Sequence, residues 1–252
     1  MIYMPTILIT GAASGIGAAT ARRLAAPGAQ LLLHTGSNME ALRGIANEVR
    51  SKGAEVAAEI GDLAVPSTAD MLVHAAKERF GKLDQIVSNA GKAQQSSFEC
   101  LSEEDLQRAF SIMPIAFFSL IKAALPLLRR SNQARVVAVS SFVAHGFGTN
   151  GLHFPGTSAA KAALEALAKS VASQIAPDGI TVNCVAPGFV RKDATAHNAT
   201  SAGAMERARE ITPNRRLGEP DDIADLIAYL LSPPAKHITG QTIHVDGGLL
   251  LP

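Results

Sequence analysis

The residues of this chain that point most directly to chemistry form a glycine-rich turn at positions 10–17, with the sequence TGAASGIG. A short apolar segment precedes the turn and an alanine-rich helical pattern follows it. Glycines in such a turn let the backbone approach a pyrophosphate, and the helix N-terminus offers N–H groups and positive potential. The spacing G-x-x-x-G-x-G also fits an ordinary strand–helix loop, but its place in the first strand–helix unit favours nucleotide binding.

The elements that would position this turn alternate along the whole chain. Short apolar segments predict strands at residues 6–10, 30–34, 55–59, 83–88, 134–140, 180–185 and 241–245. Helical patterns between them cover residues 18–26, 39–52, 67–80, 103–129, 158–175 and 220–231. Strands separated by helices of this length predict right-handed βαβ units. We therefore expect the α/β class, with one doubly wound parallel sheet of about seven strands and helices on both faces.

No internal repeat and no polar linker divides the chain, so residues 1–252 are expected to form a single domain. Residues 191–216 interrupt the alternation, have weak periodicity and follow a strand end. Ligands bind beside the carboxyl ends of the strands in such sheets, and long excursions there are often lids. This segment is therefore expected to be a substrate lid or a flexible loop.

The charge balance and the cysteine count argue against several classes of partner. Lys and Arg number 23 against 22 Asp and Glu, so a formal net charge of +1 predicts no binding of nucleic acid or of an anionic membrane. The longest largely apolar run, residues 112–121, contains Pro114 and is about half the length of a membrane span. No basic segment precedes the first apolar stretch, so no secretory signal is expected. Two cysteines, Cys100 and Cys184, cannot build a disulfide framework or a four-ligand zinc site, which predicts a reducing, cytoplasmic location and no metal.

Further motifs follow the glycine-rich turn. Asp62-Leu63 comes after the third expected strand, Asn89-Ala90-Gly91 after the fourth and Pro187-Gly188 after the sixth. Residues 216–224 and 240–248 read RLGEPDDIA and GQTIHVDGG. In this order the motifs resemble those of the short-chain dehydrogenase/reductase family over essentially the whole chain, with Ser88 in place of the first Asn of the family's NNAG motif.

This resemblance implies a Rossmann-type fold and an NAD(P)(H)-dependent oxidoreductase that acts on a carbonyl/alcohol pair or on an activated C=C bond. Hydride would pass directly between the nicotinamide and a carbon of the small-molecule substrate. The resemblance also implies a homo-oligomer, a tetramer or a dimer, formed through the long helices and the C-terminal strands. The cofactor-binding residues that it implies are Thr10, Gly11, Ser14, Gly15, Ile16, Gly17, Thr35, Ser37, Asn38, Asp62, Leu63, Asn89, Ala90, Gly91, Lys161, Pro187, Gly188 and Val190.

The end of the second expected strand bears on the choice of dinucleotide. An acidic residue there would bond the adenosine ribose hydroxyls and repel a 2′-phosphate. Residues 34–38 read HTGSN and contain no acid, while their Thr, Ser and Asn side chains can donate to phosphate oxygens. NADP(H) is therefore favoured over NAD(H). The basic residues that the family often uses for NADP are also missing, since Ser14 and Gly36 stand at those places, so a polar loop without a role in specificity is the alternative.

The catalytic positions implied by the resemblance are half preserved. The family uses a Tyr four residues before a Lys to exchange the proton at the substrate oxygen, and a Ser to orient that oxygen. Lys161 and Ser141 match the Lys and the Ser, but Thr157 stands at the Tyr position. Met113 stands where the family has an Asn that supports a water linked to the Lys. A Thr hydroxyl is far less acidic than a phenol, whose reference pKa is about 10.

The remaining tyrosines do not replace the missing one, because Tyr3 precedes the first expected strand and Tyr229 lies on the last expected helix. Loss of a general acid typically costs about 10²–10⁴-fold in rate. His145 or His153, in a loop at 142–156 that is a few residues longer than usual, is a candidate for a substitute acid. The alternative for each is an ordinary solvated loop histidine.

Two of these positions have more than one interpretation. Met113 keeps the backbone carbonyl that the family's water relay uses, and Pro114 is expected to disrupt the helix ladder at Phe110 and preserve a local kink. Alternatively, Met113 only fills space in the core. Lys161 either holds the nicotinamide ribose hydroxyls or tunes an acid that is now absent, and its survival favours cofactor binding more than turnover.

The sequence therefore supports two functions. The first is an NAD(P)(H)-dependent oxidoreductase with an altered proton donor. The second is a non-catalytic NAD(P)-binding protein or a regulatory subunit of an active relative. The preserved cofactor motifs, Ser141 and Lys161 favour the enzyme, whereas the missing acid favours the second function.

Overall fold

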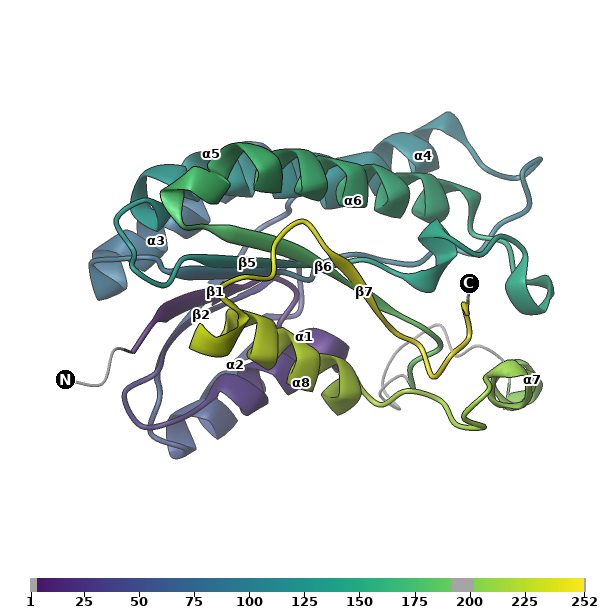
Figure 1. Ribbon diagram of the computed structural model, residues 1–252, viewed down its shortest axis with the longest axis horizontal. Coiled ribbons are helices and arrows are strands. Elements are labelled where there is room, and N and C mark those ends of the chain that lie inside the picture. The colour runs from purple at the N-terminus through teal and green to yellow at the C-terminus, as the bar shows by residue number, and fades with distance from the viewer. Residues whose placement is uncertain (1–3, 192–201, 252) are drawn as a thin grey trace.

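The computed structural model describes residues 4–191 and 202–251, which form one sheet of seven parallel strands in the order β3-β2-β1-β4-β5-β6-β7 (Figure 1). The strands are β1 (Thr6–Ile9), β2 (Gln30–Thr35), β3 (Glu55–Ile60), β4 (Gln85–Ser88), β5 (Arg135–Val139), β6 (Thr181–Pro187) and β7 (Thr242–Val245). Each strand begins and ends within two residues of its expected range. The expected fold class is therefore confirmed.

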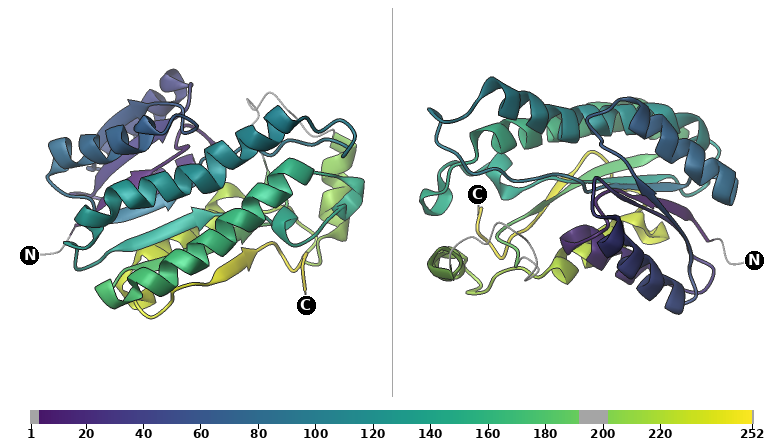
Figure 2. Two further views of the ribbon diagram at one scale, coloured as in Figure 1. Left: turned by 90° about the horizontal axis from the view of Figure 1, so that it is seen from above. Right: turned by 180° about the vertical axis from the view of Figure 1, so that it is seen from behind.

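The helices cover both faces of the sheet (Figures 1 and 2). They are α1 (Gly15–Leu24), α2 (Met39–Ser51), α3 (Ser67–Phe80), α4 (Glu103–Phe110), α5 (Ala116–Leu128), α6 (Pro155–Ile175), α7 (Ala202–Ile211) and α8 (Pro220–Leu231). Side chains alternate between the faces of a strand. Leu31 and Leu33 of β2 accordingly join the core beneath α1, α2 and α8, while Leu32 joins the core beneath α3, α5 and α6. Burial on both faces explains why the strands appear in the sequence as short apolar runs.

The strand order reverses between β1 and β4, and we call the space outside the carboxyl ends of these strands the crevice. The chain runs from β1 outward through β2 to β3, then returns to the other side of β1 and continues through β4. Ligands bind outside the carboxyl ends of the strands at such a reversal. The register pairs Ile9 of β1 with Val87 of β4, so the glycine-rich turn and the segment after Ser88 leave the sheet side by side.

The long helical pattern at residues 103–129 is not a regular α-helix throughout. A π-helical turn at Ser111–Ile115 separates α4 from α5 and contains Pro114. Proline has no N–H to contribute to the helix ladder, so the regular pattern cannot pass through this position. The expected disturbance next to Phe110 is thereby confirmed.

The combined helix Glu103–Leu128 is long and apolar enough, by composition, to cross a membrane. The sequence analysis expected no such segment. Phe117 and Leu120 on this helix are fully buried in the core with α3 and α6. The core helix of an α/β domain passes the same test of length and composition, so the finding carries no further conclusion.

The segment expected to be a lid is described only in part, because residues 192–201 lie outside the described residues. The part that is described contains α7, which the sequence analysis did not predict. The buried positions of α7 include Ala204 and Ala208, so its inner face carries small side chains that give a weak apolar signal. Asn150 donates its amide to the carbonyl oxygen of Ala204 at 3.4 Å, which joins α7 to the loop between β5 and α6.

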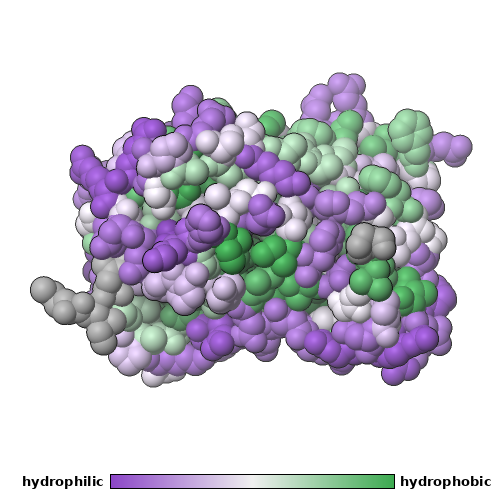
Figure 3. All heavy atoms as spheres, in the orientation of Figure 1, coloured by the Kyte–Doolittle hydropathy of each residue, from purple (hydrophilic) through white to green (hydrophobic). Residues whose placement is uncertain are grey.

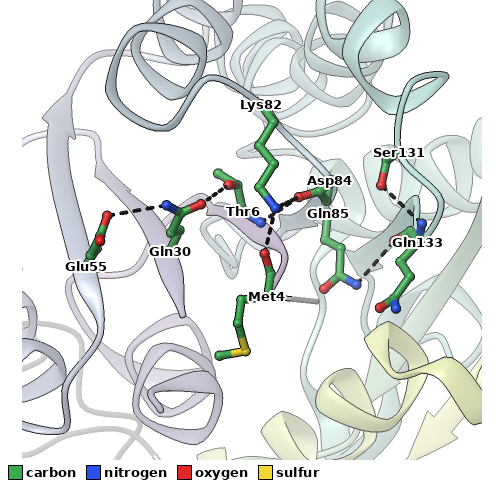
Figure 4. Close-up of polar contacts among 9 residues, drawn as sticks. All are labelled: Met4, Thr6, Gln30, Glu55, Lys82, Asp84, Gln85, Ser131 and Gln133. Carbon is green, nitrogen blue, oxygen red and sulfur yellow. Dashed lines mark hydrogen bonds and ion pairs between the residues drawn. The ribbon is translucent and has the colours of Figure 1, made fainter. Parts of the chain in front are cut away.

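A polar network lies at the amino ends of the strands (Figure 4). The crevice is at the opposite, carboxyl ends. Asp84 is buried and accepts a hydrogen bond from the backbone N–H of Thr6 at 2.8 Å. Its carboxylate also pairs with Lys82 at 3.1 Å, and Lys82 donates to the carbonyl oxygen of Met4 at 2.6 Å. These contacts fix the start of β1 against β4 and so stabilise the fold at the amino ends of the strands.

Candidate active site

The glycine-rich turn joins β1 to α1 beside the crevice. Gly17 packs so closely that a Cβ on it would lie 2.2 Å from the carbonyl oxygen of Gly11. Gly15 has a φ of +54°, and a Cβ on it would meet nothing within 4 Å. Ser14, the N-cap of α1, makes no side-chain capping bond, and the first turn of α1 carries no acidic residue. The turn therefore combines tight internal packing with an uncrowded outer side and a positive helix end, which fits a pyrophosphate.

Thr10 and Asn89 hold this turn against the end of β4. The Thr10 hydroxyl oxygen accepts hydrogen bonds from the backbone N–H groups of Asn89, at 3.0 Å, and Ala90, at 3.1 Å. The Asn89 amide donates to the carbonyl oxygens of Thr10, at 3.0 Å, and Gly11, at 3.1 Å. Both side chains are engaged within the protein, so they shape the turn.

The carboxyl end of β2 offers exposed polar groups and no cation. Thr35 is buried, Asn38 caps the N-terminus of α2 through its side-chain oxygen, and Ser37 is exposed. His34 is buried with its Nε2 2.8 Å from the carbonyl oxygen of Gly61. Burial lowers the pKa of His34, an effect that the hydrogen bond to Gly61 only partly opposes. His34 therefore supplies no positive charge for a 2′-phosphate near neutral pH.

Asp62, after β3, is paired with a cation that the sequence analysis did not identify. Arg108 of α4 donates to the two carboxylate oxygens of Asp62 at 2.9 and 3.1 Å. The hydrogen bonds from Arg108, together with one from the backbone N–H of Ala64, hold the pKa of Asp62 below its ordinary value. Any contact between Asp62 and an adenine would therefore be made with the Arg108 guanidinium alongside it, while Leu63 packs against the core beneath α3.

Lys161 and Met113 meet at the exposed Gly91, at the carboxyl end of β4. A Cβ on Gly91 would lie 3.2 Å from the Lys161 Nζ and 3.5 Å from both Cγ and Sδ of Met113. The Lys161 Nζ donates to the carbonyl oxygen of Val139 at 2.6 Å. Burial lowers the pKa of Lys161 to about 8. The structure thus places a buried amine at the bottom of the crevice, with the Met113 thioether beside it.

Thr157 and Ser141 lie near the same end of the sheet but bond to backbone groups. The buried Thr157 hydroxyl accepts a hydrogen bond from the backbone N–H of Gln94 at 3.0 Å. The Ser141 hydroxyl accepts one from the backbone N–H of Val143 at 3.4 Å. Within the described part of the chain, no hydrogen bond joins Thr157 to Lys161 or to Ser141.

The turn after β6 lies at the same, carboxyl ends of the strands. Gly188 follows Pro187 and lies so close to the chain after β7 that a Cβ on it would be 2.8 Å from the Cα of Asp246. Val190 then forms an isolated parallel bridge with Gly218. This packing requires a glycine at position 188 and directs the chain toward the segment 191–216.

Comparison with known proteins agrees with this geometry. The family model described as "Enoyl-(Acyl carrier protein) reductase" matches residues 11–250. The 3-oxoacyl-[acyl-carrier-protein] reductase FabG of Staphylococcus epidermidis is 32% identical over 247 residues, which cover 97% of this chain and 98% of that protein. The chain belongs to the short-chain dehydrogenase/reductase family.

Solved structures of this family have the same fold. A dehydrogenase/reductase from Sinorhizobium meliloti matches with a TM-score of 0.90 at 31% identity, over 98% of this chain and 95% of that one. A short chain dehydrogenase from Burkholderia cenocepacia in complex with NADP matches with a TM-score of 0.87 at 30% identity, over 97% of each chain.

The described residues supply no tyrosine to the short-chain dehydrogenase/reductase site. Tyr229 is on α8, on the face of the sheet opposite to α6, and its side chain is half exposed (Figure 1). Tyr3 lies outside the described residues. Within the residues that the structure describes, no tyrosine is therefore placed to donate a proton at this site.

The two loop histidines lie in different surroundings. His153 is exposed and lines a shallow hollow with Gln95, Ser96 and Ser97, in the segment that follows Gln94. His145 turns instead toward α6, where its Nε2 lies 3.0 Å from a carboxylate oxygen of Glu165. Of the two candidates, His153 is the one placed beside the segment that contacts Thr157.

Glu165 is a residue of this region that the sequence analysis missed. It lies one helical turn after Lys161 and is 4% exposed. A single acid among alanines and leucines, four residues after a functional Lys, is the signal that would have drawn attention to it. Its hydrogen-bond partners are Ser140 and His145, from the segment between β5 and α6, and Thr242 of β7, which no local pattern reveals.

Proposed function

We propose that the protein binds NADP(H) and catalyses hydride transfer between the nicotinamide and a carbonyl/alcohol pair or an activated C=C bond, with a proton donor other than tyrosine. The observation that carries this proposal is the buried Lys161 amine at Gly91, in a crevice whose other side is the uncrowded Gly15 turn. When bound, the dinucleotide supplies the hydride. The curated relative's name, 3-oxoacyl-[acyl-carrier-protein] reductase, supports a carbonyl group as the acceptor.

The roles of the chain's own residues follow from their positions. The turn and the N-terminus of α1 hold the pyrophosphate, and Lys161 as an ammonium donates to ribose hydroxyls. Ser141 orients the substrate oxygen. We assign the proton donor to His153, because it borders the hollow next to Gln94, whereas His145 is engaged with Glu165.

The preference for NADP(H) rests on the end of β2. Residues 34–38 carry no carboxylate to repel a 2′-phosphate, and Ser37 is exposed there. The solved relative from Burkholderia cenocepacia is described in complex with NADP, which supports the same choice. Calorimetric titration tests it: we expect saturable binding of NADPH and weaker binding of NADH. No saturable binding of either at millimolar concentration would remove the proposed function.

A second candidate function is favoured by the hydrogen bond between Thr157 and Gln94. This contact joins α6 to the segment after β4 at the place where the family has its proton donor. The protein would then bind the dinucleotide without turnover and act as a partner of an active relative. Activity measured on a panel of ketones with NADPH separates the two functions, because the non-catalytic protein binds NADPH and oxidises none of it.

We also propose a homo-oligomer, a dimer or a tetramer, in the cytoplasm. The long helix exposes Ile115 and Phe118 by 51% and 47%, and β7 is an edge strand. Apolar side chains gather in the middle of the face that carries β7 and α8 (Figure 3). Light scattering of the eluting protein tests the oligomer, and a monomer at micromolar concentration would overturn it.

A further inference from the structure

A buried carboxylate lies directly behind the proposed cofactor site. Glu165 of α6 accepts hydrogen bonds from the Ser140 hydroxyl, at the end of β5, and from the Thr242 hydroxyl of β7, at 3.2 Å. Its third partner is the His145 Nε2 at 3.0 Å. Burying a carboxylate is costly unless it is hydrogen-bonded. Three partners, two from the segment between β5 and α6 and one from β7, therefore hold this charge in place.

Glu165 and Lys161 share one face of α6. Residues four apart on a helix are neighbours, with Cβ atoms about 5–6 Å apart. Both side chains are buried, and Lys161 reaches the crevice while Glu165 lies against β5 and β7. In this low-dielectric environment a carboxylate favours the ammonium form of a nearby amine.

Cys184, the other group whose charge would act on Lys161, does not supply this negative charge. Burial lowers the pKa of Lys161 to about 8, and negative charge at Cys184 or Glu165 would raise it. Burial also raises the pKa of the Cys184 thiol to about 12, so Cys184 is neutral when Lys161 titrates. The remaining charged or titratable groups of the cluster are His145 on the loop, His244 and Asp246 on β7 and its end, and Lys169 on α6.

We propose that Glu165 is a positioning residue, the buried counter-charge that keeps Lys161 an ammonium ion in the cofactor crevice. This proposal rests on the proposed function, because the ammonium is needed to donate to the ribose hydroxyls of the dinucleotide. The carboxylate acts through Lys161 and does not touch the substrate. Its effect is therefore on the pH range over which the dinucleotide binds.

The test is the Kd for NADPH from pH 6.5 to 9.5, measured by calorimetry. For the wild type we expect the affinity to fall as the pH rises through about 8, because Lys161 loses its proton there. In Glu165→Gln, which keeps the shape and removes the charge, the midpoint should move lower by at least about one pH unit. In Lys161→Arg the fall above pH 8 should disappear, since a guanidinium stays charged.

Two controls separate the charge from the structure around it. Ser140→Ala removes one hydrogen bond but not the charge, and its midpoint should stay at the wild-type value. Cys184→Ala should also leave the pH midpoint of NADPH binding unchanged. A lower midpoint in Cys184→Ala would overturn the proposal, even if Glu165→Gln does not fold. An unchanged midpoint in folded Glu165→Gln also overturns it. Absence of NADPH binding by the wild type is a different result, which removes the proposed function itself.

Discussion

The Thr157 hydroxyl accepts a hydrogen bond from the backbone N–H of Gln94, 3.0 Å away, and so joins the first turns of α6 to the segment after β4. In this family the same position carries the proton donor. The hydroxyl that remains is buried and has a structural partner. Thr157 and Met113 both differ from the residues that the family resemblance implies, and Thr157 lies one helical turn before Lys161.

Thr157→Tyr is expected to gain NADPH-dependent reduction of simple ketones, by about 10²-fold over background, because it places a phenol four residues before the Lys161 ammonium. Adding Met113→Asn should contribute less, since the Met113 backbone carbonyl is already present and accepts from Ala116. NADPH oxidation is measured for the wild type, both single variants and the double variant, after each is shown to bind NADPH. A Tyr variant that binds NADPH and stays inactive on the whole panel would instead support the non-catalytic protein.

His153→Ala is expected to lower kcat/KM by about 10²-fold on any substrate that the wild type turns over, if His153 is the proton donor. His74→Ala, which removes an exposed histidine on α3, is the matched control and should change nothing. Rates are compared from pH 5 to 9. Equal rates for His153→Ala and the wild type across this range would move the role to water or to the substrate itself.

Gly17→Ala is expected to abolish NADPH binding, because its Cβ would meet the Gly11 carbonyl oxygen at 2.2 Å and push α1 away from the turn. Gly44→Ala on α2 is the control, since a Cβ there meets nothing within 4 Å. The control should bind NADPH normally and be more stable by about 0.5–1 kcal/mol. Normal NADPH affinity in Gly17→Ala would contradict the packing described for the turn.

Asp84→Ala is expected to reduce the free energy of unfolding by about 1–3 kcal/mol, because it leaves the Thr6 N–H without its carboxylate, whereas the partly exposed Lys82 ammonium is solvated by water. Glu55 belongs to the outer end of the same network, because it accepts a hydrogen bond from the Gln30 amide at 3.3 Å and Gln30 accepts one from the Thr6 hydroxyl at 2.8 Å. Glu55→Gln should cost less than about 1 kcal/mol. Urea unfolding measures both variants. The NADPH affinity of folded Asp84→Ala should equal that of the wild type. A large loss of affinity would show that the amino ends and the carboxyl ends of the strands are coupled.

The strands and the interruption of the long helix at Pro114 could be predicted from the sequence because their causes are local. Three consecutive leucines at 31–33 must be buried on both faces, and Pro114 must interrupt a helix ladder wherever the helix lies. The sequence analysis did not predict α7, because the buried positions of this helix include alanines, whose apolar signal is weak.

The contacts that define the site come from distant parts of the chain. Arg108 binds Asp62 across 46 residues, and Thr242 reaches Glu165 across 77. Sequence alone placed Gly91 after the fourth expected strand and Lys161 on the expected helix at 158–175, but it could not show that His145 would turn toward Glu165. Such pairings depend on tertiary packing, which no motif of a few residues encodes.

The polar network at Thr6, Asp84 and Lys82 lies at one end of the strands and the crevice lies at the other (Figure 4). The contacts that stabilise the fold and the residues proposed to do chemistry therefore lie at opposite ends of the strands. Substitutions in the loops beyond β4 and β5 can redirect chemistry while the opposite edge keeps the chain folded. Replacing Thr157 by tyrosine would alter only the carboxyl-end region, and it would leave the contacts of Thr6, Asp84 and Lys82 in place.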